Sequence, residues 1–399
     1  MPSFAWNVGC APAGILCVLN SPMDHLRRRR TELARALKAG GLDALLLSDP
    51  LNVAYLCGFT GADSFLVLTP RRAILVSDDR YAGQIQDECP DLETHLRPHN
   101  QTTPQAVAQV LGGVKVRSVG VESAHLTLAE FETLKELAPA LDWSPSKDLV
   151  EALRAIKDDT EIEEIREAIA IAARAFTMLR AMLTPKDTEK ELADALDGYM
   201  RRAGGRGSAF PPIVAAGERS ALPHCPPTDR VVSESDFLLV DWGAQGRLYQ
   251  SDLTRMIQIA APPSKASRTK RGRVETRLQK VYTIVLQAQA RAIAAVRPGA
   301  DAKDVDAAAR SFIAAAGYGP HFTHGLGHGI GLQTHEAPRV RENSTDVLRA
   351  GMVITIEPGI YLPGWGGVRI EDDVLVTEDG CEVLSAAVPK EWEDVTMND

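Results

Sequence analysis

The sequence predicts an α+β protein in which a smaller α/β domain precedes a larger domain of helices and Gly-rich strands. Between Asp24 and about Trp143, short apolar runs alternate with helical stretches, whereas the last third of the chain is rich in strands and glycine. The 399 residues are enough for two domains. We expect a flexible extension over residues 1–23, the first domain over 24–150 and the second over 151–390.

The first domain is expected to contain three helices and four strands. We predict helices over residues 26–39 (ended by Gly40-Gly41), 80–88 and 127–137, and strands over 44–47, 64–68, 73–76 and 116–121. No strand is followed by a Gly-rich loop of the kind that cradles phosphates, so the pattern gives no support to a dinucleotide-binding domain.

The second domain begins with a long helix, because Thr160 and Glu163 form the pattern of a capping box ahead of an apolar stripe. Further helices are expected over 188–203, 276–296 and 302–316, a hairpin over 237–242 and 248–259, and strands over 352–357 and 368–377. Residues 260–280 carry seven basic residues and one acid. We interpret this segment as a solvated loop, rather than as an RNA or membrane patch, because the protein as a whole is acidic.

Charge and hydropathy exclude several classes of function. The chain has 44 Lys and Arg against 53 Asp and Glu, a net charge of −9, so its field does not collect phosphates and nucleic acid is not expected as a partner. No uncharged apolar run approaches the roughly 18–20 residues of a membrane span. Residues 1–23 contain no charged side chain, whereas a signal peptide needs Lys or Arg before its apolar run. Met23 could therefore be the true initiator, a hypothesis that the intact mass of the native protein would test.

The cysteines indicate a reducing compartment. No pair has the C-x-x-C spacing, and a chain of this length needs no disulfide staples, so we expect free thiols and a cytoplasmic location. The six are Cys10, Cys17, Cys57, Cys89, Cys225 and Cys381.

Clustered histidines are the first chemical signal. His321, His324, His328 and His335 fall within fifteen residues, and glycine occupies every second position from Gly325 to Gly331. So much glycine disfavours a helix, which excludes a zinc helix with His324 and His328 one turn apart. An extended or tightly turning backbone that allows close approach fits better, with glycine-lined packing as the alternative.

Acidic residues on apolar strands are the second signal. Asp241 and Glu357 end apolar runs, Asp252 lies on the returning strand of the hairpin, and strand alternation places Arg369, Glu371 and Asp373 on one face. A buried carboxylate is costly unless it is paired or bound to metal. Four of them beside a Gly-flanked histidine indicate a shared cation, and mostly oxygen ligands suit Mn²⁺ or a similar divalent ion. Five ligands are enough for two ions that share carboxylates and supply a hydroxide nucleophile.

These residues carry a resemblance to a known family. Val-Asp-Trp-Gly-Ala, Ser-Asp-Leu-Thr-Arg, Gly-His-Gly-Ile-Gly, Ile-Glu-Pro-Gly-Ile-Tyr and Arg-Ile-Glu-Asp resemble, in order, the ligand motifs of the pita-bread metallopeptidases. That family includes aminopeptidase P, prolidase and methionine aminopeptidase. Residues 52–61 and 77–81 resemble the creatinase-type N-terminal domain of its proline-specific branch. The resemblance implies a creatinase-like α/β domain followed along the chain by a pita-bread catalytic domain.

The resemblance also implies roles for single residues. Asp241 would hold one metal ion, Asp252 and Glu371 would bridge two, and His328 and Glu357 would complete the second. Glu357 would also act as a proton shuttle. His224 would contact the substrate near the scissile bond, and His335 would stabilise the tetrahedral intermediate. His324 and Arg369 would line the proline pocket and the far side of the site. The two ions are expected to be Mn²⁺, with Co²⁺, Zn²⁺ or Fe²⁺ as alternatives.

The implied substrates are proline-containing peptides. The nitrogen of an Xaa-Pro amide has no hydrogen, so a site that reads the proline ring and polarises the carbonyl suits it better than one that grips an N–H. Cys225 stands where the family has glycine. Aminopeptidase P and prolidase remain open, and a homodimer or homotetramer is expected. A non-catalytic pita-bread scaffold is the alternative from another class. The N-terminal domain disfavours methionine aminopeptidase, and the full ligand set disfavours creatinase, whose chemistry on this fold uses no metal.

Overall fold

The computed structural model describes residues 24–259 and 267–395, and the chain divides into two compact units, Met1–Pro145 and Ser146–Asp399. The expected extension over residues 1–23 lies outside the described residues, as does the part of the basic segment at 260–266. No helix in the described part of the chain is long and apolar enough to cross a membrane.

The first unit is built on a six-stranded mixed sheet in the order β4-β3-β2-β1-β5-β6. Strand β1 runs parallel to β5 and antiparallel to β2, and β3 runs parallel to β4. Alternate strand residues such as Leu46, Val67 and Val119 form one core cluster with Val107 and Leu111 of α4. The elements are α1 (Asp24–Ala39), β1 (Ala44–Leu47), α2 (Pro50–Cys57), β2 (Phe65–Leu68), β3 (Ala73–Asp78), α3 (Ala82–Glu88), β4 (Glu93–Arg97), α4 (Thr103–Val114), β5 (Ser118–Glu122), α5 (Leu128–Leu137) and β6 (Asp142–Ser146).

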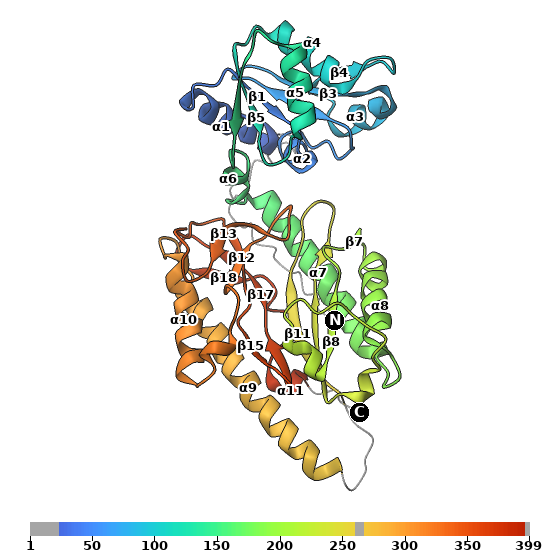
Figure 1. Cartoon of the computed structure of the whole chain (residues 1–399), viewed down its shortest axis with the longest axis vertical. Coiled ribbons are helices and arrows are strands. Elements are labelled where there is room, and N and C mark those ends of the chain that lie inside the picture. Colours follow the sequence, from blue (N-terminus) through green and yellow to red (C-terminus); the bar gives the residue numbers. More distant parts are fainter. Residues whose placement is uncertain (1–23, 260–266, 396–399) are drawn as a thin grey trace, which may run out of the picture. The chain divides into compact units, whose positions relative to one another are not determined.

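The second unit places its strands between two pairs of helices, as Figure 1 shows. Helices α7 and α8 share a core cluster with the three-stranded sheet β11-β9-β8, while α9 and α10 share another with the five-stranded sheet β13-β12-β14-β17-β18 and with the pair β15-β16. The helices are α6 (Glu151–Arg154), α7 (Asp159–Met182), α8 (Glu189–Arg202), α9 (Ser267–Ala295), α10 (Ala302–Ala315) and α11 (Trp392–Val395). The strands are β7 (Gly207–Ser208), β8 (Ile213–Ala216), β9 (Phe237–Trp242), β10 (Ala244–Gln245), β11 (Leu253–Gln258), β12 (Gly327–Gly329), β13 (Glu336–Val340), β14 (Val353–Ile356), β15 (Gly359–Leu362), β16 (Gly366–Arg369), β17 (Asp372–Val376) and β18 (Cys381–Val383).

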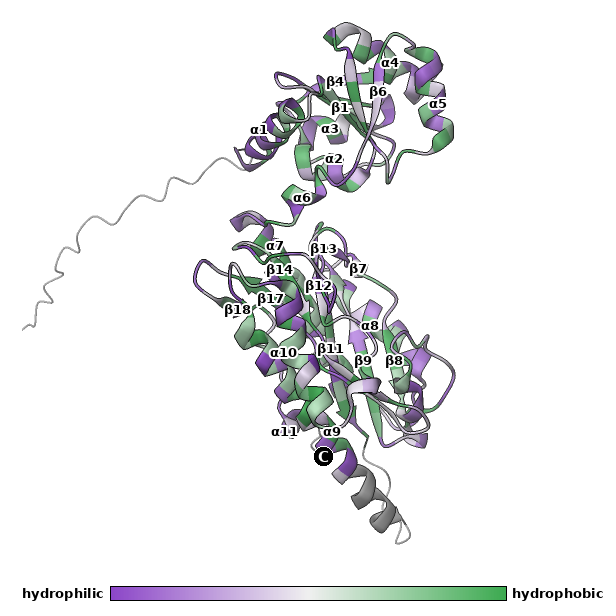
Figure 2. Cartoon of the chain, turned by 60° about the vertical axis from the view of Figure 1, so that its left-hand side comes forward, coloured by the Kyte–Doolittle hydropathy of each residue, from purple (hydrophilic) through white to green (hydrophobic). Residues whose placement is uncertain are grey.

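The central strands are apolar because both of their faces are covered. All six residues of β9 and all six of β11 are buried, and Figure 2 shows β8 and β9 in the hydrophobic colour while α8 alternates between the two colours. The Trp242 ring stacks on Phe176 of α7 with centroids 4.3 Å apart, and its Nε1 donates to the Ala172 carbonyl at 3.0 Å. This packing fixes the end of β9 beside α7.

Most expected helices and strands are present, and the differences have physical causes. The capping box of α7 is formed by Asp158 and Glu161, not by Thr160 and Glu163, since Asp158 Oδ1 accepts from the Thr160 and Glu161 amides, both at 3.1 Å. The sequence reasoning also missed α2, β4, α4 and β6. Strand β4 alternates weakly, with every residue at least partly exposed, so its hydrophobic period is absent.

Two expectations in the second unit were wrong in extent. The hairpin is present, but Trp242 pairs with Leu253, so its second strand begins after Asp252. The basic segment was expected to be a loop, yet α9 begins at Ser267 and includes most of it, because Arg and Lys are good helix formers.

The run 368–377 is also divided between two strands. Strand β16 pairs with β15 and β17 pairs with β14, so Ile370 and Glu371 lie between the two pairings.

Candidate metal centre

A cavity of about 590 Å³ in the second unit is lined by all nine residues that the sequence singled out as site candidates. They come from five separate stretches of chain: His224; Asp241 and Asp252; His324, His328 and His335; Glu357; and Arg369 and Glu371. Phe210, Pro211, Pro212 and Ile213 add an apolar wall to the same cavity.

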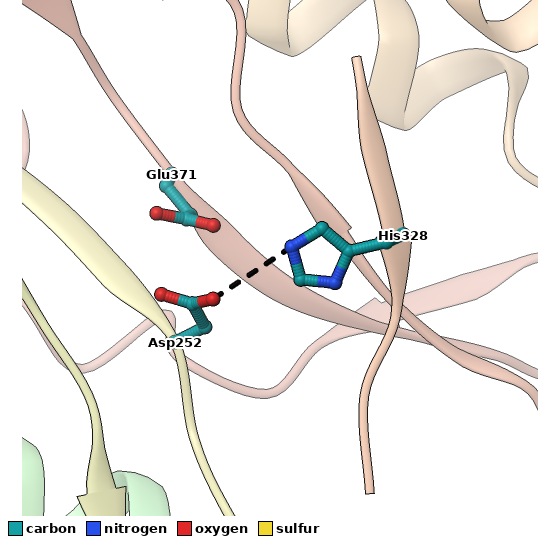
Figure 3. A group of neighbouring side chains, drawn as sticks. All are labelled: Asp252, His328 and Glu371. Carbon is teal, nitrogen blue, oxygen red and sulfur yellow. Dashed lines mark ion pairs between the residues drawn. The ribbon is translucent and has the colours of Figure 1, made fainter. Parts of the chain in front are cut away.

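Asp252, His328 and Glu371 form the core of the cluster (Figure 3). One ligand atom from each lies within 4.8 Å of the others, and all three residues are buried. Asp252 precedes β11, His328 is the middle residue of β12 and Glu371 follows β16. Nε2 of His328 is 3.7 Å from Oδ2 of Asp252.

Asp241 and Glu357 lie beside this core. Oε1 of Glu357 is 3.5 Å from the same Nε2 of His328. One oxygen of Asp241 accepts a hydrogen bond from Arg369, whereas its Oδ1 is buried and has no hydrogen-bond partner among the described residues. Because an orphaned buried carboxylate oxygen is costly, it indicates a partner of another kind, such as a cation.

The electrostatics of the carboxylates point the same way. Burial, followed by the charges of Glu371 and Asp241, raises the pKa of Asp252 well above its usual range. Burial and the Glu371 charge do the same to the pKa of Glu357. Burial and Asp241 raise the pKa of Glu371 to about 8. These carboxylates repel one another in a buried site, so they need protons or cations to be stable together.

His328 is prepared to act as a neutral ligand. Its Nδ1 lies 3.1 Å from the Gly329 carbonyl, an acceptor, so the proton belongs on Nδ1 and Nε2 presents its lone pair to the carboxylates. Burial, followed by the neighbouring His335, lowers the pKa of His328 to about 3. One imidazole with four carboxylates is a donor set that fits divalent ions preferring oxygen.

A hydrogen-bonded chain continues from the cluster to His324, and it contains two residues that the sequence reasoning did not assign. Arg369 Nη1 donates to the Tyr361 hydroxyl at 2.8 Å, and that hydroxyl lies 2.8 Å from Nε2 of His324. Arg369 Nε also donates to Oγ1 of Thr254 at 3.1 Å. Strand alternation predicts Thr254 on the same face as Asp252, and Tyr361 is the last residue of the motif Ile-Glu-Pro-Gly-Ile-Tyr. The sequence therefore contained a signal for each of these two residues.

Asp373 is a further residue without an assigned role. Its Oδ2 accepts the backbone N–H of Asp252 at 3.1 Å, which holds that residue in place. Burial raises the pKa of Asp373 well above its usual range, and its Oδ1 has no hydrogen-bond partner in the described ranges. Arg369, Glu371 and Asp373 were expected on one face. Arg369 and Glu371 both contact Thr254, and Asp373 contacts Asp252.

His224 and His335 are the exposed members of the nine. The His335 ring lies 4.3 Å from the His328 ring, centroid to centroid. Burial, with Arg339, lowers the pKa of His335. Cys225, the departure from the family motif, is buried and lines the same cavity next to His224.

Comparison with protein-family models gives two matches that together span most of the chain. Residues 163–378 match the model of metallopeptidase family M24, and residues 29–156 match the creatinase/prolidase N-terminal domain. The family resemblance and the two-domain fold expected from the sequence are thereby confirmed.

Curated proteins and solved structures of similar length agree with this. An Xaa-Pro dipeptidase of Pyrococcus horikoshii is 35% identical over 364 residues, which cover 91% of this chain and 98% of that protein. An Xaa-Pro dipeptidase structure from Bacillus anthracis has a TM-score of 0.84 at 36% identity and covers 92% of this chain and 99% of its own. An X-Pro aminopeptidase structure from Thermotoga maritima has a TM-score of 0.81 at 35% identity, with coverage of 90% and 99%.

Proposed function

Since this chain belongs to metallopeptidase family M24 and carries a creatinase/prolidase N-terminal domain, we propose that it hydrolyses Xaa-Pro peptide bonds with two divalent metal ions. The observation that carries the proposal is the buried group of Asp252, His328 and Glu371 in a cavity that also contains Asp241 and Glu357. Relatives described as Xaa-Pro dipeptidase and X-Pro aminopeptidase, at about 35% identity, support the substrate class.

In this proposal, Asp241 would hold the first ion, His328 and Glu357 would hold the second, and Asp252 and Glu371 would be ligands shared by the two. Bound divalent ions supply a water nucleophile at neutral pH and polarise the scissile carbonyl. The oxygen-rich donor set favours Mn²⁺. The free Oδ1 of Asp241 and the lone pair on Nε2 of His328 are the donor atoms most plainly prepared for metal.

The other residues bind substrate and move protons. Glu357 takes a proton from the attacking water and delivers it to the leaving proline nitrogen, which has no hydrogen of its own. His335 donates an N–H to the oxygen of the tetrahedral intermediate, and His224 contacts the substrate near the scissile bond. His324, oriented by its 2.8 Å contact with Tyr361, lines the proline pocket with the apolar wall that starts at Phe210.

Hydrolysis assays test the proposal. An Xaa-Pro dipeptide and an Xaa-Pro-Xaa tripeptide should be assayed beside their Xaa-Ala counterparts, with Mn²⁺ and with a chelator. We expect cleavage of a proline substrate only when metal is present, and loss of cleavage in Asp252→Asn. Dipeptide cleavage alone would define a prolidase, and tripeptide cleavage an aminopeptidase P. If neither proline peptide is cleaved in a metal-dependent way, the proposal is rejected.

A further inference from the structure

His224 and His335 differ from the other two candidate histidines, His324 and His328, whose rings form hydrogen bonds within the protein. The imidazoles of His224 and His335 make no hydrogen bond to any residue in the described ranges. Each stands on a connecting segment, which we call the His224 loop (residues 217–228) and the His335 loop (residues 331–336). Because the rings have no hydrogen bonds of their own, the backbone of each loop has to place them.

Glu189, the first residue of α8, holds both ends of the His224 loop. Its side chain is fully buried. The carboxylate accepts the Ala216 N–H at 2.8 Å ahead of the loop and the Thr228 N–H at 3.0 Å at its end. It also accepts from Arg219 Nε at 2.9 Å, and Nη2 of Arg219 donates to the Pro226 carbonyl at 2.6 Å. His224 therefore stands on a loop closed around one carboxylate.

Glu336 has the corresponding place in the His335 loop, directly after the histidine. Its Oε1 accepts from Arg154 Nη2 at 2.5 Å and from the Gln333 N–H at 3.1 Å, and its Oε2 accepts from Lys157 Nζ at 3.2 Å. The side chains of Arg154 and Lys157 are 2% and 0% exposed. The loop is thus anchored to the segment around the start of α7.

Gln250 holds the other side of the His335 loop. Its Nε2 donates to the Leu332 carbonyl at 3.2 Å, and its Oε1 accepts from the Thr334 hydroxyl at 2.6 Å. The loop is therefore fixed on both sides of the histidine, whereas the imidazole has no hydrogen bond to the described part of the chain.

We propose that Glu189 and Glu336 are positioning residues, each of which orders one loop and so places one histidine. A buried charge is stable only when it is paired and hydrogen-bonded, and here the pairing groups belong to the loops or tie the loops to a helix. The hydrogen bonds of each carboxylate define one conformation of its loop. The catalytic consequence rests on the proposed function, whereas the ordering of the loops does not.

The first test measures loop order without any substrate. Hydrogen exchange of the metal-free protein is compared between wild type, Glu189→Gln and Glu336→Gln, with Glu382→Gln as a matched control because Glu382 pairs with Arg166 at the surface. We expect about tenfold faster exchange over residues 217–228 in Glu189→Gln only, and over 331–336 in Glu336→Gln only. Faster exchange in both loops for both variants, or in neither loop, would overturn the proposal.

The second test is a crossed pair of double-mutant cycles on kcat. Glu189→Gln should lower kcat about 10- to 100-fold in wild type and in His335→Ala, but less than about threefold in His224→Ala. Glu336→Gln should show the reverse dependence. Additive effects in all four combinations would mean that the glutamates act only on stability.

Arg219→Ala and Lys157→Met provide milder variants if the glutamine variants do not fold. Each removes one partner and leaves the glutamate in place, so the same loop-specific exchange pattern is expected at smaller size, and its absence would overturn the proposal. If the wild type cleaves no Xaa-Pro peptide, the proposed function fails, but the exchange experiment still decides whether the glutamates order the loops.

Discussion

Thr254 and Glu371 are joined by two hydrogen bonds although they lie 117 positions apart in the chain. The Thr254 hydroxyl donates to Oε2 of Glu371 at 2.7 Å, and the Glu371 N–H donates to the Thr254 carbonyl at 3.2 Å. This bridge connects β11 to the segment between β16 and β17, so it brings together the elements that carry Asp252 and Glu371. Within the described residues, Oε1 of Glu371 accepts no hydrogen bond.

Removal of the Thr254 hydroxyl should therefore disturb both stability and metal binding. Thr254→Val keeps the shape but leaves Arg369 Nε without its acceptor at 3.1 Å. We expect the free energy of unfolding, measured in urea, to fall by about 1–3 kcal/mol. The affinity for Mn²⁺, measured by calorimetry, should fall about 10- to 100-fold. Thr254→Ser keeps the hydroxyl and is the control. Equal affinities of the Val and Ser variants would contradict the role of the bridge.

Metal binding should stabilise the protein through the buried cluster. With Mn²⁺ at about 100 times its dissociation constant, we expect a gain of about 2.7 kcal/mol in unfolding free energy, seen as a higher Tm. Asp252→Asn should abolish this gain, whereas Asp379→Asn, an exposed aspartate in the same unit, should retain it. A Tm of the Asp252→Asn protein that still rises with Mn²⁺ would place the metal elsewhere.

Gly327 and Gly329, which flank His328, should not accept a side chain. A Cβ at Gly327 would lie 1.9 Å from the Thr355 carbonyl oxygen, and one at Gly329 would lie 2.0 Å from that of Ala337. We expect Gly327→Ala and Gly329→Ala each to lower the unfolding free energy by several kcal/mol and to weaken Mn²⁺ binding. Gly112→Ala is the matched control, because that glycine lies in α4 with open space around it. There, alanine should stabilise by about 0.5–1 kcal/mol. Wild-type stability of the Gly327 variant would refute this account of the close approach.

The anchoring of Glu336 predicts a pH dependence of stability. Burial by itself would raise the pKa of Glu336, but the charges of Lys157 and Arg154 outweigh it and hold the pKa below its usual value. A depressed pKa means that the folded state binds fewer protons than the unfolded state. The stabilisation is therefore complete above the unfolded pKa, about 4.3, and is lost as pH falls through the lower folded value.

Urea unfolding of the wild type and of Glu336→Gln between pH 7 and pH 3.5 measures this effect. At pH 7 the variant should be about 3–5 kcal/mol less stable, because it leaves two buried cations without their counter-charge. The difference should shrink below about pH 4.3. A difference that is constant over the whole range would show that the charge of Glu336 does not contribute.

The sequence predicted the helices that have a clear apolar period or a capping pattern. It predicted the residues of the site from other signals, namely residue types and motifs. Helices such as α1, α8 and α10 follow from apolar periodicity, and α7 from its capping pattern, although that pattern was assigned two positions away from Asp158. Strand β4, which is exposed along its length, had no such period and was missed. The buried carboxylates and the clustered histidines were recognisable from their residue types and spacing, whereas His224 and the site roles of His324, His335 and Arg369 came from the resemblance to family motifs. The structure places all nine candidates around one cavity.

The sequence by itself determined that the protein is a two-domain chain with a net charge of −9. It also determined which donor atoms the protein offers, namely several carboxylate oxygens and a histidine among glycines. Tertiary structure decided which partners support those donors. Thr254 reaches Glu371 across 117 positions and Arg154 reaches Glu336 across 182. Such pairs have no local period. Burial of charged and hydrogen-bonding groups is costly unless they are paired, and the packing of separate helices and strands decides which groups can pair.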